Sequence, residues 1–134
     1  HCFVQQKRDA TGYCHRIICA QDYSAVTAAC MMVKREAFDK VHGLSEEFQV
    51  AFNDIDFCLR LGKAGYLVVY NPYAELYHYE SKSRGLEDTP EKVARFNREI
   101  ASFEKHWPEI LRDGDPYYNP NITLESQDFS LKRI

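Results

Sequence analysis

Two aspartates, two residues apart, open a short amphipathic segment that constrains this chain more than any other feature. The segment reads Phe52-Asn53-Asp54-Ile55-Asp56-Phe57-Cys58-Leu59-Arg60-Leu61. Asn53 is a good N-cap residue, and Asp54 and Asp56 fall in the first turn, where the positive end of the helix dipole favours anions. Gly65 predicts a left-handed C-terminal end. A capped helix alone would account for both acids, so a chemical role needs further support.

This helix has apolar residues on two faces, which predicts that it is buried on most sides. The two groups are Ile55, Leu59 and Gly62 on one face and Phe57, Leu61 and Ala64 on the other. Asp56 and Arg60 are four residues apart with the acid first, which favours an ion pair.

Apolar runs on either side of this helix predict several strands. The expected strands cover residues 16–20, 25–33, 66–70 and 74–79. We expect 25–33 to be buried, with small residues in its first half that leave room above it, and the unbroken run 66–70 to be central in a sheet. A two-turn helix is predicted over 36–42, ending at Gly43.

A second long helix is predicted after Thr89, which would cap it, with Pro90 in the first turn. Its apolar stripe consists of Val93, Phe96, Ile100, Phe103 and Trp107. The opposite, polar face consists of Arg95, Arg98, Glu99 and Lys105. We expect this helix to pack and to carry no chemistry. The remainder is proline-rich and predicts an extended arm.

Composition excludes several classes of protein. The chain has 134 residues, a net charge of -3 and a pI of about 6.0, which gives no electrostatic footprint for nucleic acid. No apolar run approaches the length of a membrane span. Five cysteines without a CxxC pair indicate neither a disulfide framework nor a zinc ribbon, so we expect a reducing, cytoplasmic setting with Cys30 and Cys58 as buried thiols.

The run 74–79 ends near His78, which precedes a polar loop over 80–85. A lone strand histidine is more often structural than functional. The loop contains Ser83 and Arg84, and a basic, hydroxyl-rich loop suits a ligand that bears phosphate.

Together these motifs resemble the C-terminal half of a family 2 glycosyltransferase with the GT-A fold, similar to bacterial enzymes of O-antigen and surface polysaccharide synthesis. The segments that carry the resemblance follow the family's order over residues 16–134. They are Val26-Thr27-Ala28-Ala29-Cys30, Lys34-Arg35-Glu36-Ala37-Phe38, Gly43-Leu44-Ser45-Glu46-Glu47-Phe48, the segment 52–60, Gly65-Tyr66, Tyr77-His78, Ser83-Arg84-Gly85 and Asp115-Pro116-Tyr117-Tyr118-Asn119-Pro120.

The resemblance implies an α/β fold: a partial nucleotide-diphospho-sugar transferase domain with a mixed sheet and flanking helices. The N-terminal nucleotide-binding half, with its DxD motif, would be missing. Residues 1–112 would form the acceptor-side half, and 113–134 an extended arm or linker. The sheet edge left open could be covered in a homodimer.

The resemblance also implies an inverting transfer from a nucleotide-sugar donor to a hydroxyl of a glycan or lipid-linked glycan acceptor in polysaccharide biosynthesis. Asp54 would be the general base, Asp56 would hold Arg60, and His78 would help to bind a divalent metal, Mn²⁺ or Mg²⁺, in the full-length enzyme. Residues expected near donor or acceptor are Thr27, Ala28, Ala29, Asn53, Asp56, Glu80, Ser83 and Arg84.

Two positions depart from the family pattern, because Asn53 stands where many members have Glu and Ala28 where many have Gly. The base is kept, and Ala28 narrows the pocket slightly. We expect the chain alone to bind no metal and to transfer no sugar. We place the full-length protein in the cytoplasm, free or peripheral to the inner membrane face.

Two other functions remain open at this point. A non-catalytic carbohydrate-binding or interaction module would use the nine tyrosines and the polar loop. A metal-dependent phosphoesterase would need Asp54, Asp56 and His78 to converge within about 2.0–2.2 Å of one metal ion. Two acids at i and i+2 of one helix diverge, which disfavours the phosphoesterase.

Overall fold

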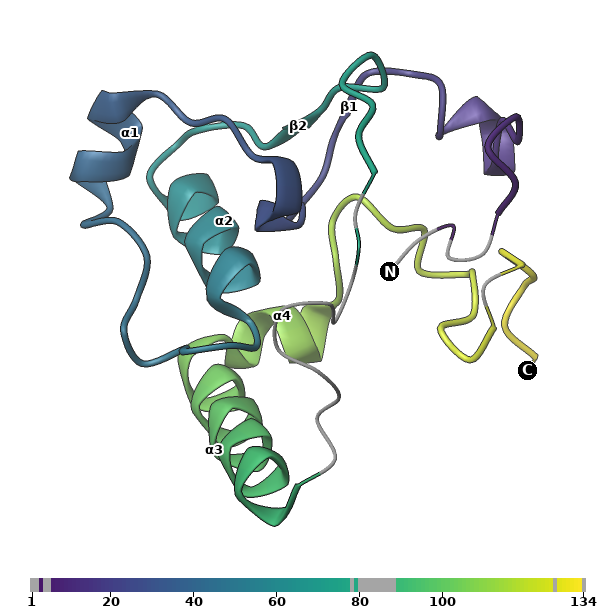
Figure 1. The fold of residues 1–134 in the computed structure, drawn as a ribbon. Helices are drawn as coiled ribbons and strands as arrows, with labels where there is room; N and C mark the ends of the chain where they lie inside the picture. The colour runs from purple at the N-terminus through teal and green to yellow at the C-terminus, as the bar shows by residue number, and fades with distance from the viewer. Residues whose placement is uncertain (1–2, 4–5, 78, 80–88, 127, 134) are drawn as a thin grey trace.

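The computed structural model describes residues 3, 6–77, 79, 89–126 and 128–133. Its described part is a small α/β arrangement in which helices predominate (Figure 1). In chain order the elements are η1 (Tyr13–His15), β1 (Gln21–Asp22), η2 (Ala28–Cys30), α1 (Arg35–Lys40), α2 (Asn53–Lys63), β2 (Val69–Tyr70), α3 (Pro90–His106) and α4 (Pro108–Asp113).

Helix α2 is the centre of the fold and lies between α1 and α3 (Figure 1). On one face, Leu59 packs in a cluster with Phe48 of the loop before α2, Phe103 of α3 and Trp107, which caps the end of α3. The other face packs Phe57 and Leu61 against Ala37 of α1. The prediction of a helix buried on most sides is therefore confirmed.

The two ends of α2 are built differently from one another. Asn53 was predicted as N-cap, and this is wrong: the cap is Phe52, in the left-handed conformation with φ 63°, and Asn53 is the first helical residue. At the other end Gly65 has φ 89°, and Tyr66 N–H donates to the Leu61 carbonyl over 3.0 Å. This is a Schellman ending, as the glycine predicted.

The sheet is much smaller than expected. It consists of two antiparallel strands, β1 and β2, with Gln21 opposite Tyr70 and Asp22 opposite Val69. Among the described residues, 16–20, 66–68 and 74–77 form no strand, so the predicted mixed sheet with a central strand is not found. A strand requires a neighbour to pair with, and Leu67 in the predicted central strand is 68% exposed.

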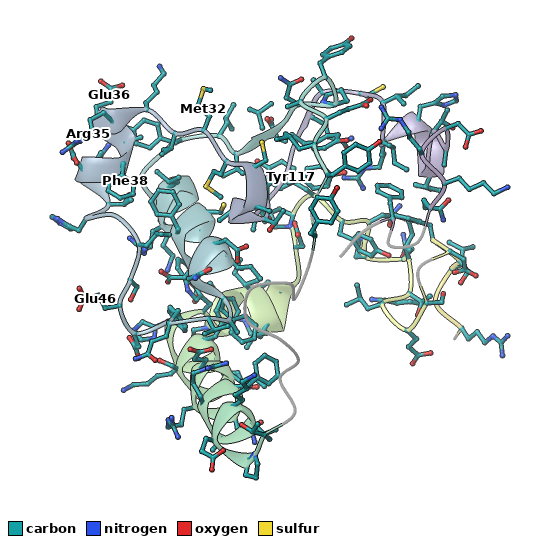
Figure 2. All side chains as sticks on the ribbon, viewed as in Figure 1. Met32, Arg35, Glu36, Phe38, Glu46 and Tyr117 are labelled. Carbon is teal, nitrogen blue, oxygen red and sulfur yellow. The ribbon has the colours of Figure 1, made fainter. Side chains whose placement is uncertain are left out.

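Residues 25–33 also differ from the predicted buried strand. The Thr27 hydroxyl accepts a hydrogen bond from Ala29 N–H over 3.3 Å and caps the short helix η2, since Ser and Thr compete with sheet pairing through such local bonds. Residues 27–30 are exposed, including Cys30, which was predicted to be buried. Met32 is 99% exposed and points away from the ribbon (Figure 2).

Helix α3 begins as predicted, with the Thr89 hydroxyl accepting from Lys92 N–H and Pro90 in the first turn. Its apolar stripe is only partly covered: Phe103 is buried, whereas Val93 and Phe96 are exposed. Glu99, predicted on the solvent face, is buried. The short helix α4 was not predicted, although a proline suits its first position.

The C-terminal residues lie against the N-terminal segment (Figure 1). The Phe129 ring stacks on Tyr13 at 4.8 Å and on Phe3 at 5.1 Å between ring centroids. Ile122 is buried and pairs with Leu131 in an isolated bridge. In the part of the chain described, none of the helices has both the length and the apolar character needed to cross a bilayer.

Candidate functional site

Asp54 lies in the first turn of α2, partly buried, with its carboxylate turned toward η2. Its Oδ2 accepts a hydrogen bond from Ala28 N–H over 3.1 Å, and its Oδ1 accepts from Ile55 N–H over 2.9 Å. The Asn53 Oδ1 in turn accepts from Asp54 N–H over 2.7 Å. These bonds bring together Asp54, Asn53 and the η2 segment, three of the regions that the sequence had marked.

A buried thiol holds the segment that precedes η2. Cys58 Sγ lies 3.7 Å from the Val26 carbonyl oxygen, to which the thiol donates, so α2 and residues 26–28 are joined by two contacts. Burial raises the pKa of the Cys58 thiol, and the negative charge of Asp54 adds to the rise. The neutral thiol is thus the form that this position favours.

Asp56 is 3% exposed, and its partners differ from those of Asp54. Its Oδ2 accepts from Arg60 Nε over 2.8 Å, the ion pair that the spacing predicted, and its Oδ1 accepts from Trp107 Nε1 over 3.1 Å. Arg60 Nη1 donates to the carbonyls of Val41 and Gly43. Asp56 therefore joins α2 to the end of α3 and to the residues after α1, a structural position.

Sequence reasoning missed Glu99. Its carboxylate accepts three backbone N–H groups from the loop that leads to Asp54, at 3.0 Å from Gln49, 3.2 Å from Val50 and 2.9 Å from Ala51. The available signal was spacing: position 99 is three residues after Phe96 and four before Phe103, which places it beside the apolar stripe.

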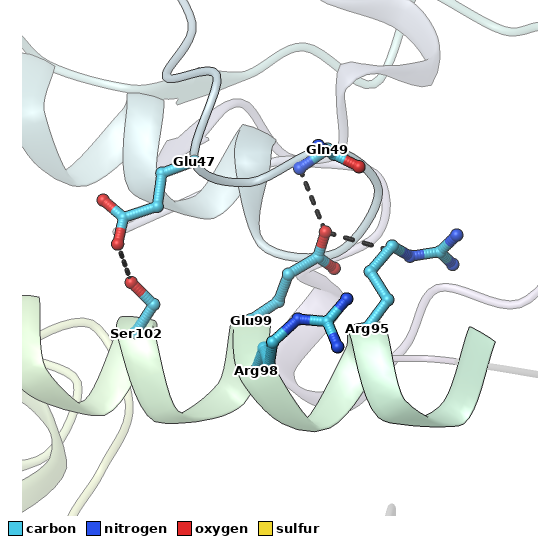
Figure 3. A pocket seen from close by; sticks show the side chains of 6 residues that line it. All are labelled: Glu47, Gln49, Arg95, Arg98, Glu99 and Ser102. Carbon is cyan, nitrogen blue, oxygen red and sulfur yellow. Dashed lines mark hydrogen bonds and ion pairs between the residues drawn. The ribbon is translucent and has the colours of Figure 1, made fainter. Parts of the chain in front are cut away.

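Asp54 lines neither of two surface hollows that the described residues form. The first, of about 250 Å³, lies between α3 and the loop before α2 and is lined by Glu47, Gln49, Arg95, Arg98, Glu99 and Ser102 (Figure 3). The second, of about 380 Å³, is formed by the two terminal segments, with Phe3, Tyr13 and Phe129 among its lining residues.

The described residues do not fit a metal site. Among these residues there is no group of three or more His, Cys, Asp or Glu side chains that could hold a metal ion. Asp54 and Asp56 have separate partners, the Ala28 N–H group for Asp54 and the Arg60 guanidinium for Asp56. His78, Glu80, Ser83 and Arg84 lie outside the described residues, so metal binding by His78 stays a prediction.

Three relatives illustrate what the chain is similar to. It is 56% identical over 121 residues to the uncharacterized protein y4gI of Sinorhizobium fredii, covering 90% of this chain and 13% of that protein. It is 37% identical over 113 residues to the O-antigen biosynthesis protein RfbC of Myxococcus xanthus, covering 84% and 8%. It is 42% identical over 60 residues to an N-acetylglucosaminyl-diphospho-decaprenol L-rhamnosyltransferase of Mycobacterium tuberculosis, covering 45% and 20%.

The chain thus spans about an eighth of the y4gI protein and less than a tenth of RfbC. No solved structure matches it significantly. Residues 5–103, most of the chain and all of α1 and α2, match the glycosyl transferase family group 2. The chain that holds Asp54 against η2 therefore belongs to glycosyl transferase family group 2.

Proposed function

We propose that this chain supplies the general base of an inverting glycosyl transfer, with Asp54 as that base. The acceptor oxygen forms a bond to the anomeric carbon as Asp54 takes the acceptor proton. The bond from the anomeric carbon to the diphosphate breaks, and its electron pair leaves with the nucleoside diphosphate. Attack opposite the leaving group inverts the configuration, and a positioned carboxylate lowers the barrier by taking the proton in the transition state.

The observation that carries the proposal is how the Asp54 carboxylate is held. The hydrogen bonds described at its two oxygens come from uncharged backbone N–H groups, those of Ala28 and Ile55. Such donors orient a carboxylate without neutralising it, and each oxygen has a second lone pair that can accept a proton. Asp56, by contrast, is buried against Arg60 and Trp107 and has no access to a substrate.

The proposed donor, acceptor and fold rest on the family to which the chain belongs. We propose a partial GT-A domain that uses a nucleotide-sugar donor and a glycan or lipid-linked glycan acceptor, because the relatives named above include an O-antigen biosynthesis protein and a rhamnosyltransferase. Residues 27–29 would lie beside the donor sugar, next to the base. The nucleotide would be bound by parts of the protein outside this chain, so transfer would require the full-length protein.

The test is Asp54→Asn in the full-length protein, with release of nucleoside diphosphate measured for UDP-, GDP- and dTDP-linked sugars. An N-acetylglucosaminyl-diphospholipid serves as acceptor, after the name of the Mycobacterium relative. Loss of a general base should lower kcat by about 10²–10⁴-fold. The matched control is Asp39→Asn, an exposed carboxylate of α1 paired with Arg35, which should leave kcat unchanged. Wild-type turnover in Asp54→Asn would refute the assignment.

A carbohydrate-binding module remains the second candidate, and one observation favours it. Tyr73, Tyr77 and Tyr79 are all strongly exposed within one short segment, and exposed aromatic rings present an apolar face to ligands. Binding of free glycans without any nucleotide-sugar turnover in the full-length protein, together with loss of that binding in Tyr77→Ala, would favour this function over transfer.

A further inference from the structure

Glu99 is a buried carboxylate that the proposed transfer does not use. It lies on α3 and is 4% exposed. A charged group at such depth requires hydrogen-bond donors, and Figure 3 shows its side chain extending from α3 to the loop that carries Gln49. Oε1 accepts from Gln49 and Val50 N–H, Oε2 accepts from Ala51 N–H, and Arg95 Nε lies 3.9 Å from Oε1.

The loop held by Glu99 leads directly into the candidate site. Ala51 is three residues before Asp54, and Phe52 between them adopts the left-handed conformation. The Phe52 ring stacks on Phe103 of the same helix α3 at 4.9 Å between centroids. The Phe52 carbonyl then accepts Asp56 N–H over 2.8 Å and begins α2.

Each residue from 49 to 54, the segment that leads into α2, is therefore held by a contact that the structure describes. Glu99 holds the backbone of 49–51, the α3 rings hold Phe52, and the Asn53 side chain accepts Asp54 N–H. Backbone donors in a loop have no sheet or helix partner. Glu99 is the acceptor for three consecutive N–H groups of this loop, so its carboxylate anchors the loop to α3.

We propose that Glu99 is a positioning residue for Asp54. By holding residues 49–51 it sets where the N-terminus of α2 begins, and thereby where the Asp54 carboxylate stands relative to η2. Glu99 acts through the backbone and touches no substrate. The inference rests on the proposed function of Asp54, and it assigns a role to a helix that the sequence predicted to carry no chemistry.

The first test is Glu99→Gln in the full-length protein, which keeps the shape of the side chain but replaces one acceptor oxygen by an N–H₂ donor. We expect kcat to fall by about 10–100-fold, because displacements of about 1 Å have effects of this size. The donor KM should change by less than about twofold, since the proposed function places the nucleotide, which anchors the donor, on parts of the protein outside this chain. Glu104→Gln, an exposed glutamate of the same helix, is the matched control and should keep wild-type kcat.

A readout independent of turnover is amide hydrogen exchange in the same variants. The amides of Gln49, Val50 and Ala51 should exchange faster in Glu99→Gln, while those of the α2 interior keep their wild-type protection. Assays are run below the unfolding transition of each variant, so that a general loss of stability does not lower kcat. Unchanged exchange at all three amides would overturn the proposal.

A second variant separates position from charge. Glu99→Asp keeps the charge but withdraws both oxygens by one methylene, so positioning predicts a lower kcat in this variant too, whereas a purely electrostatic role predicts wild-type kcat. Should Glu99→Gln fail to fold, Glu99→Asp carries the test. If Asp54→Asn is inactive but either folded Glu99 variant keeps wild-type kcat, the role of Glu99 is overturned. Wild-type turnover in Asp54→Asn instead overturns the proposed function itself.

Discussion

Trp107 donates a hydrogen bond from its indole Nε1 to Oδ1 of Asp56 over 3.1 Å, joining the end of α3 to the first turn of α2. Asp56 also accepts from Arg60, so its buried carboxylate is held from two sides. Glu99 makes the reciprocal connection, from α3 to the loop before α2. The start of α2 is thus fixed by two buried carboxylates, one on each helix.

Asp56→Ala should destabilise the fold by about 3–5 kcal/mol, because Arg60 would be left with an uncompensated charge in a largely buried position. Trp107→Phe should cost less, about 1–3 kcal/mol, since it removes one donor to a carboxylate that keeps Arg60. Urea unfolding followed by circular dichroism measures both, and a double-mutant cycle measures the coupling. Asp39→Ala, at an exposed pair, should cost less than about 1 kcal/mol. Equal losses at positions 56 and 39 would contradict this account.

Two glycines near the end of α2 should respond in opposite directions to alanine. A Cβ would meet no atom within 4 Å at either Gly62 or Gly65, so only the backbone distinguishes them. Gly62 is helical, and Gly62→Ala should stabilise by about 0.5–1 kcal/mol. Gly65 has φ 89°, and Gly65→Ala should destabilise by about 1 kcal/mol. Thermal unfolding of the pair checks the sign, and a stabilising Gly65→Ala would show that the Schellman ending is wrong.

The Cys58 thiol should make stability depend on pH at the alkaline end. Burial raises the pKa of this thiol above its ordinary range, so in the unfolded chain the thiol loses its proton at lower pH than in the folded one. The contribution is fully present below the unfolded pKa and is lost as the pH rises through the folded pKa. Stability should therefore fall between about pH 8 and pH 10 by more in the wild type than in Cys58→Ala.

Urea unfolding at pH 8 and pH 10 measures this difference, with Cys30→Ala as the control for an exposed thiol. The same burial should make Cys58 the slowest to react with iodoacetamide among the described cysteines, since Cys14, Cys19 and Cys30 are exposed. Rapid labelling of Cys58 in the folded chain would contradict the observed packing.

Helices α1, α2 and α3 could be predicted from the sequence because their signals are local, whereas η2 and α4 were missed. Thr89 followed by Pro90 fixed the start of α3, and Gly65 the end of α2. The Asp56–Arg60 pair was equally predictable from four-residue spacing. Strand β2 falls within the predicted run 66–70, but its short extent and its partner were not predictable, because a strand depends on a partner that its own residues do not specify. In the described part of the chain, Val69–Tyr70 pairs with Gln21–Asp22, which lies just outside the predicted run 16–20.

In the candidate site, too, local features could be predicted and long-range contacts could not. The position of Asp54 at the start of a helix was predicted, but its contact with Ala28 was not, because 25–33 was expected to be a strand. The bonds from Trp107 to Asp56 and from Gln49 to Glu99 join residues about fifty positions apart. No periodicity reports contacts at that range, so the supports of the site became visible only in three dimensions.

The left-handed Phe52 combines a backbone cost and a packing gain at a single codon. Glycine adopts φ 63° at lower cost than phenylalanine, but Phe52→Gly would also remove a ring that packs on the buried cluster and stacks on Phe96 and Phe103. The lost packing outweighs the relieved strain, since removing a buried phenylalanine ring costs about 3–5 kcal/mol. Directed evolution for thermostability and for catalysis should therefore both retain an aromatic residue at position 52.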